Sequence, residues 1–186
     1  MPCGPKQAAP FTQVVPAVPG QRSSPTCDTR PRRGSVRQVL PEWPAGTVTI
    51  LATAGEVPHT IPVSAALRAG PRRALIALAS SRGSLARLRA DPWVSLAIVC
   101  EDTAVTAYGR ARVLDDLVDG VVAVEIEVER VQDHNRPTFA IESAVRWRWT
   151  DPDAERRDAE VRAALARLAV GAQRSAGGAQ RLAVGA

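Results

Sequence analysis

One segment of the sequence alternates between apolar and polar side chains in a way that only an extended strand can satisfy. In GVVAVEIEVERV, residues 120–131, valine or isoleucine recurs at every second position, and glutamates fill the positions between them in the second half. Side chains of a strand point alternately to its two faces, so one face of this strand must be buried and the other wetted. The segment therefore predicts a sheet with a hydrophobic core on one side.

The remaining strands follow from shorter patterns. The run ALIALAS, residues 74–80, is continuously apolar and is typical of a strand buried on both faces. Further strands are expected at 47–54, 57–67, 93–100, 104–114 and 145–149. A short helix is expected near Ser84, and a longer one begins after Asp151-Pro152 and ends near Leu168, since Asp caps helices and proline suits their first position. These elements predict a mainly β (α+β) fold, a closed or partly closed antiparallel barrel of six or seven strands with two helices.

The two ends of the chain differ in composition from its middle. Residues 1–38 are rich in Pro, Ser, Gly and Arg and show no periodicity, which predicts a disordered N-terminal tail. The hexapeptide RLAVGA occurs at 167–172 and again at 181–186, and residues 169–186 are expected to form a flexible C-terminal tail. The folded domain is therefore expected over residues 39–168, a length that supports one hydrophobic core.

The distribution of charge along the chain limits which kinds of molecule the protein can bind. Residues 1–39 hold six basic side chains and one acidic one, and residues 166–186 hold three basic side chains and no acidic one. Between them lie fifteen basic and eighteen acidic side chains, so the expected domain is mildly acidic although the whole chain has a net charge of +5. This argues against a nucleic-acid partner. No apolar run has the roughly 20 residues of a membrane span, and three cysteines without metal-ligand spacing suggest a cytoplasmic location.

A strand-to-helix corner, SSRGS at residues 80–84, is the best candidate for a binding site. The first N–H groups of a helix have no partners within the helix, and the helix dipole makes this end electropositive. Ser81 and Ser84 can add hydroxyl donors, Arg82 can hold a phosphate through two N–H groups, and Arg87 follows one turn later. The corner thus has the chemistry of a phosphate site, although the same residues suit an ordinary serine cap beside a solvated arginine.

Four motifs in and around this corner occur in an order that resembles the pyridoxamine 5′-phosphate oxidase-like split-barrel flavoproteins. They are Pro58-His59, the corner itself, Leu88 with Asp91-Pro92-Trp93-Val94, and Gly109-Arg110-Ala111. The resemblance spans about residues 40–150 and implies a split barrel with the short helix after the third strand. It also implies a homodimer with FMN at the subunit interface, and a flavin-dependent oxidoreductase acting on a small-molecule substrate.

The resemblance also implies which residues meet the cofactor. The flavin ring would lie along the strand formed by His59, Thr60, Ile61, Pro62, Val63 and Ser64. The phosphate would meet Ser80, Ser81, Arg82, Ser84 and Arg87. Tyr108 and Arg110 either line the cofactor cleft or are ordinary exterior residues.

Several alternatives remain open at this stage. Ser84 stands where many relatives have a lysine, so a deazaflavin-dependent reductase on the same fold is one alternative, and a non-catalytic flavin- or haem-binding protein is another, with His134 as a haem or metal ligand. Trp147 and Trp149 are expected to share a core face, although the resemblance also allows them to stack on a partner subunit's flavin. With two histidines, no nucleophilic set and no metal-ligand set can be assembled. No catalytic residue is therefore assigned, and whether the chain is an enzyme is left open.

Overall fold

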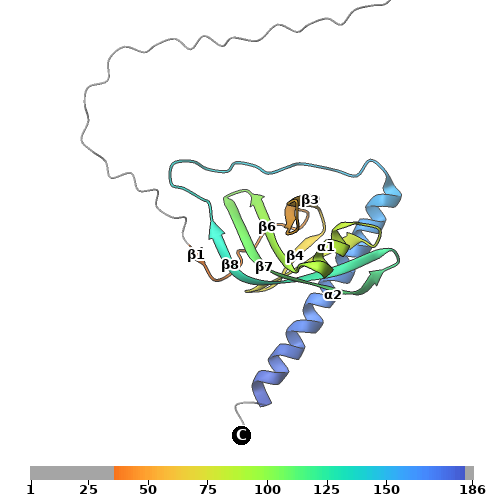
Figure 1. Ribbon diagram of the computed structural model, residues 1–186. Helices are drawn as coiled ribbons and strands as arrows, with labels where there is room; N and C mark the ends of the chain where they lie inside the picture. The colour runs from red at the N-terminus through yellow and green to blue at the C-terminus, as the bar shows by residue number, and fades with distance from the viewer. Residues whose placement is uncertain (1–35, 183–186) are drawn as a thin grey trace, which may run out of the picture. The chain divides into compact units, whose positions relative to one another are not determined.

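The computed structural model describes residues 36–182, without the side chains of 36–37, 115–116 and 172–182. Strands dominate this part of the chain, and the two helices follow the fifth and the eighth strand (Figure 1). The elements are β1 (Val36–Arg37), β2 (Thr49–Thr53), β3 (His59–Val63), β4 (Ala66–Gly70), β5 (Arg73–Ala79), α1 (Ser84–Ala90), β6 (Trp93–Cys100), β7 (Thr103–Val118), β8 (Val121–Asp133) and α2 (Pro152–Leu182). Neither helix, as far as it is described, is long and apolar enough to cross a membrane.

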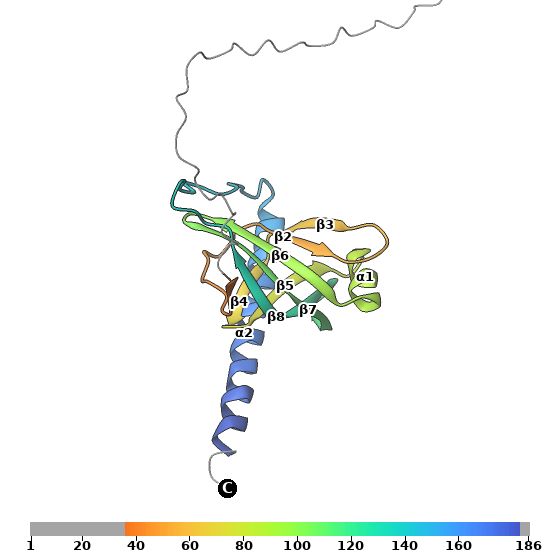
Figure 2. The same cartoon turned by 60° about the vertical axis from the view of Figure 1, so that its left-hand side comes forward.

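The strands form one antiparallel sheet in the order β3-β2-β6-β7-β8-β5-β4, and β1 pairs with β8. The sheet curls around its own inner face (Figure 2), and β3 and β4 at its two ends are not paired with each other. The mainly β, antiparallel, split-barrel fold expected from the sequence is confirmed. Some details differ. The described sheet has eight strands, not six or seven, and the short helix α1 follows the fifth strand, not the third. The strand expected at 57–67 is divided into β3 and β4, and residues 134–150, which include the strand expected at 145–149, form no strand.

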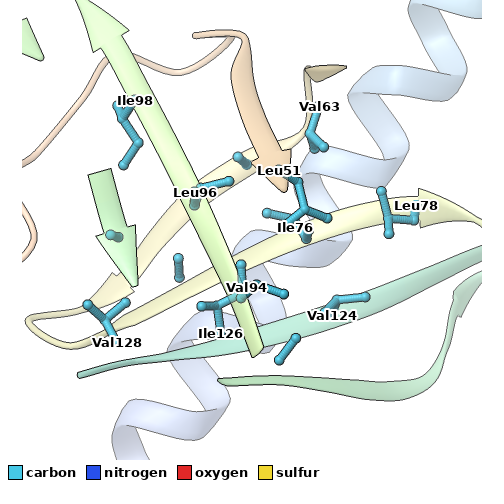
Figure 3. Close-up of a cluster of buried hydrophobic side chains, with 14 of the residues drawn as sticks. Leu51, Val63, Ile76, Leu78, Val94, Leu96, Ile98, Val124, Ile126 and Val128 are labelled. Atoms are coloured by element: carbon cyan, nitrogen blue, oxygen red, sulfur yellow. The ribbon is translucent and has the colours of Figure 1, made fainter. Parts of the chain in front are cut away.

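The inner face of the curled sheet holds the main hydrophobic core. Leu51, Ile76, Leu96 and Ile126, from four different strands, are fully buried there and point toward one another (Figure 3). Leu85 and Leu88 of α1 join the same cluster, as their three-residue spacing in the sequence predicts. Helix α1 therefore closes one end of the core.

The outer face of one half of the sheet is covered by α2. Val161, Leu165 and Ala169, four residues apart along the helix, pack on Leu75 of β5 and Ala123 of β8. Strand β5 is consequently buried on both faces, which confirms the interpretation of its continuous apolar run.

Helix α2 begins where its sequence predicts, but it ends later than predicted. Asp151 Oδ1 accepts the Asp153 N–H at 2.9 Å, which confirms the cap. The helix continues to Leu182, past the end expected near Leu168, because the sequence there is rich in alanine and glycine alone does not stop it. Of the tails expected at 1–38 and 169–186, residues 1–35 and 183–186 lie outside the described residues, and 36–37 form β1.

Trp147 and Trp149 do not lie in a core, contrary to expectation. Each is 37% exposed, and their rings meet edge to face with centroids 5.1 Å apart. Trp147 Nε1 donates to the Gly46 carbonyl at 3.1 Å. Since residues 134–150 join no sheet, they share no strand face that could carry these rings into the interior.

Gly109 marks the closest approach of β7 to β8. A Cβ built on it would lie 2.0 Å from the Glu127 carbonyl oxygen, and the pairing register shifts at this point. We expect Gly109→Ala to lower the free energy of unfolding by about 3 kcal/mol, because two backbones must move apart. Urea unfolding followed by circular dichroism measures this. Gly171→Ala is the control: nothing lies within 4 Å of its Cβ, and in a helix it should stabilise by about 1 kcal/mol. Equal effects of the two changes would contradict the close approach.

Candidate functional site

The corner between β5 and α1 leaves the first turn of α1 without a side-chain cap. Gly83 occupies the cap position in a helical conformation (φ −58°, ψ −20°), and no side chain accepts a hydrogen bond from the first N–H groups. Ser84 begins the helix one residue later. The cap is therefore not the ordinary serine cap that the sequence also allowed.

Ser84 connects the corner to the first residue of β3. It is 2% exposed, and its hydroxyl lies 3.4 Å from His59 Nε2. Two residues that the sequence placed at opposite ends of the expected cofactor, His59 at the ring and Ser84 at the phosphate, are thus in contact. The corner and β3 form one site.

Arg87 makes a second connection, to the turn between β2 and β3. Its guanidinium donates to the Val57 carbonyl at 3.0 Å and lies over Gly55, which has a φ of +143°. That φ favours glycine, so this turn can pass close beneath the arginine. Part of the Arg87 guanidinium is thus committed to the protein, while its other N–H groups are available.

Ser80, Ser81 and Arg82 are the uncommitted members of the corner. All three are exposed, and their side chains make no hydrogen bond or ion pair with any described residue. They combine two hydroxyls and a guanidinium with the first turn of α1, where no side chain caps the N–H groups and the Leu85 N–H donates to the Arg82 carbonyl at 3.1 Å. This set of donors suits an anionic group with several oxygens, such as a phosphate.

Strand β3 presents free backbone groups beside this corner. The side-chain hydroxyls of Thr53 and Thr49 in β2 donate to the His59 and Val63 carbonyls of β3, so these two carbonyls point toward β2. Carbonyls alternate in direction along a strand, so those of Thr60 and Pro62 point to the open edge, and the Thr60 N–H points the same way. Pro62 has no N–H to lose there, which explains why a proline is tolerated.

Of the other residues expected along the ring, Ile61 and Val63 point their side chains into the main core. Any contact they make with a ligand must come from backbone atoms. Ser64 follows β3 and is half-buried.

A hollow on the outer face of the sheet adjoins β3. Cross-strand pairing places Thr60 opposite Ala52, Ala52 opposite Ser95, and Ser95 opposite Tyr108, so one row crosses four strands. The hollow has a volume of about 530 Å³ and includes the last three of these residues. Its full lining is Ala52, Thr53, Ala54, Trp93, Val94, Ser95, Tyr108, Glu129 and Arg130. The outer face next to the β3 edge can therefore accommodate a ligand.

Two arginine–aromatic pairs border this hollow. The Arg130 guanidinium lies 4.0 Å from the centre of the Tyr108 ring, and that of Arg110 lies 4.5 Å from the centre of Trp93. The sequence analysis considered Tyr108 and Arg110 but missed Trp93 and Arg130 as neighbours of a site. Strict alternation along β8 would place Arg130 on the same face as the buried Val128. A register shift opposite Gly109 instead leaves Arg130 on the outer face, with Val128 and Val131 both buried. The sequence does not show this shift.

His134 lies outside the site. Its Nε2 is 2.8 Å from the Thr106 hydroxyl, just beyond the end of β8. Within the described residues, no group of three or more His, Cys, Asp or Glu side chains is placed to hold a metal ion.

Comparison with known proteins finds likeness only among solved structures. No family model matches the sequence, and no curated protein matches it. A candidate pyridoxamine 5′-phosphate oxidase from Listeria innocua is 15% identical, with a TM-score of 0.42 over 48% of this chain and 90% of its own. General stress protein 26 from Bacillus anthracis is 11% identical, with a TM-score of 0.42 over 55% and 90%. An F420 reductase is 11% identical, with a TM-score of 0.41 over 47% and 90%.

The different bonding of the two arginines predicts different effects on stability. Arg87→Ala should lower the free energy of unfolding by about 1 kcal/mol, because the Val57 carbonyl loses its charged donor. Arg82→Ala should change it by less than about 0.5 kcal/mol, since the Arg82 side chain is exposed and makes no hydrogen bond or ion pair with a described residue. Urea unfolding of both variants tests this. A larger loss in Arg82→Ala would show that this arginine serves the fold and is not available to a ligand.

Proposed function

We propose that this chain is a cytoplasmic homodimer that binds FMN and uses it for oxidoreductase chemistry on a small molecule. The observation that carries the proposal is the juxtaposition of an uncommitted phosphate-binding corner with the open backbone edge of β3, joined through Ser84 and His59. FMN has a phosphate at one end and a flat ring with a polar edge at the other. The two parts of the site match these two parts of the ligand.

At the phosphate end, the groups available fit the cofactor. Ser80, Ser81 and Arg82 would hold the phosphate oxygens, and the free N–H groups of Arg87 would add to them. Ser84 would contribute its backbone N–H, because its hydroxyl faces His59. The expected residues are all retained, with this change in the role of Ser84.

At the ring end, backbone groups do the binding. The Thr60 N–H and the carbonyls of Thr60 and Pro62 face the open edge of β3 and can pair with the polar edge of a flavin ring. His59, Ile61, Val63 and Ser64 would position this edge. Bound FMN supplies hydride transfer, while the chain's residues bind and orient it, which fits the lack of assigned acid–base residues.

The same outer face supports the homodimer. Pro62, Ile50 and Ala97 lie side by side across β3, β2 and β6, and Val99 lies further along β6. Ile50 and Val99 are 41% and 46% exposed, which leaves an apolar row open to water. A second copy covering this row would bury it and exclude water from the ring.

A deazaflavin is the alternative cofactor. Its ring has a similar polar edge, so the β3 edge serves it equally well. Because Ser84 stands in place of a lysine, Arg82 and Arg87 are the cations at the corner. They would suit a deazaflavin cofactor whose phosphate is arranged differently from that of FMN.

The test is the absorption spectrum of the purified protein, with and without added FMN, and a titration of FMN into two variants. Arg82→Ala should weaken FMN binding by about 1.5–3 kcal/mol, the scale of a charged hydrogen bond. Arg89→Ala is the matched control, since Arg89 is an exposed arginine of α1 whose side chain makes no hydrogen bond or ion pair with a described residue. It should leave the affinity unchanged.

Each outcome has a distinct meaning. Stoichiometric FMN, lost in Arg82→Ala, supports the proposal, and sedimentation should then give a dimer. If the protein takes up no FMN but binds added deazaflavin, the site is a deazaflavin site. A Soret band removed by His134→Ala would indicate haem, and unchanged FMN affinity in Arg82→Ala would rule out the corner as the phosphate site.

A further inference from the structure

A second hollow lies against α2, beyond the C-terminal end of β3. It has a volume of about 530 Å³, within the range of small-molecule pockets. It is bounded by the segment before β2, the start of β4 and the middle of α2, and it shares no lining residue with the hollow on the outer sheet face. Its lining is Glu42, Trp43, Ala45, Ala65, Ala66, Leu67, Arg68, Arg162, Ala163, Leu165 and Ala166. We refer to it as the α2–β4 pocket.

The α2–β4 pocket exists because alanines occupy positions that larger side chains would fill. Ala66 of β4 and Ala65 just before it form part of its wall, and Ala163 and Ala166 line it from α2. Leu165 between them is 1% exposed and holds the helix on the sheet. The helix is thus packed firmly along its central stripe and leaves room on this flank.

The rest of the wall is apolar with a charged rim. Trp43, half-buried against the main core, offers the aromatic surface, and Leu67 adds an aliphatic one. Arg68 and Arg162 stand at the rim with side chains 26% and 25% exposed. An apolar interior beside cations favours a ligand that has an apolar body and a negative end.

The two arginines are not equally neutralised. Arg162 Nε lies 2.6 Å from Asp158 Oδ2, a close pair. Arg68 Nε donates to the Leu40 carbonyl at 3.1 Å, and its acidic neighbour Glu42 is 3.7 Å away with a side chain 90% exposed. An exposed pair at that distance contributes little, so Arg68 is the cation that can accept another anion.

We propose that the α2–β4 pocket binds an organic monoanion, an apolar carboxylate with its charge at Arg68 and its hydrocarbon among the alanines and Trp43. The site is independent of the proposed FMN site. Since its lining comes from α2, β4 and the segment before β2, ligand bound there would also stabilise the docking of α2 on the sheet.

The test uses the full chain with two probes, laurate and 8-anilinonaphthalene-1-sulfonate, whose fluorescence rises when it leaves water. We expect one saturable fluorophore site per chain, excited by energy transfer from the nearby tryptophans, Trp43 among them, and displaced by laurate. Dodecanol, which has the same chain without the charge, should displace the fluorophore roughly tenfold less well.

Two pairs of variants locate the site. Ala166→Leu fills the pocket from an exposed helical position and should abolish binding, while Ala159→Leu on the same helix, outside the pocket, should not. Arg68→Gln should weaken laurate binding roughly tenfold or more and erase the preference over dodecanol, while Arg167→Gln, on the other flank of α2, should not. Circular dichroism checks that each variant is folded.

Three results would overturn the proposal. One is the absence of a saturable site in the folded wild-type chain. The second is binding that survives both Ala166→Leu and Arg68→Gln. The third is displacement of the fluorophore by FMN, which would place it on the sheet face. The first two leave the FMN proposal untouched, so the two can fail separately.

Discussion

The architecture depends on burying β5, together with the first residues of β8 beside it, on both faces. Leu75 of β5 and Ala123 of β8 face α2, while their neighbours Ile76 and Val124 face the main core. Neither face can be left to water, so the sheet must curl around one and receive a helix on the other. The uncovered outer face thereby lies over β3, β2, β6, the first part of β7 and the second part of β8, and the proposed cofactor and partner surfaces both lie there.

The same burial fixes the position of the polar corner. Strand β5 ends at Ala79, and α1 is anchored in the core by Leu85 and Leu88, so the residues between must lie at the surface. The bonds from Ser84 to His59 and from Arg87 to Val57 then hold this exposed segment against β3. A loop that carries ligand-binding groups is in this way held on two rigid elements.

Local patterns in the sequence predicted what depends on local chemistry. The alternation of β8, the apolar run of β5 and the Asp151-Pro152 start of α2 were sufficient to predict those elements. The pattern at 145–149 also alternates, but a strand needs a partner, and no described strand pairs with this segment. The predicted end of α2 was wrong because the RLAVGA repeat was taken to mark a flexible tail, although the alanine-rich sequence there favours a helix.

At the candidate site, the sequence predicted which residue types take part but not which residues they contact. The corner was visible as a cluster, whereas the bonds of Ser84 and Arg87 cross 25 and 30 residues of chain. Likewise, an alanine in the sequence says nothing about whether its neighbours close over it, so the α2–β4 pocket has no sequence signal.

The proline in β3 has a consequence for how the molecule behaves among its own copies. An uncovered sheet edge is a template on which further strands can add without limit, and that is how ordered aggregates grow. At Pro62 the edge offers an acceptor without a donor, so an incoming strand loses a hydrogen bond in the middle of the ladder. A small molecule that pairs with the Thr60 N–H and with the Thr60 and Pro62 carbonyls needs no donor at Pro62, so the edge remains open to it while continuous growth into fibres is hindered.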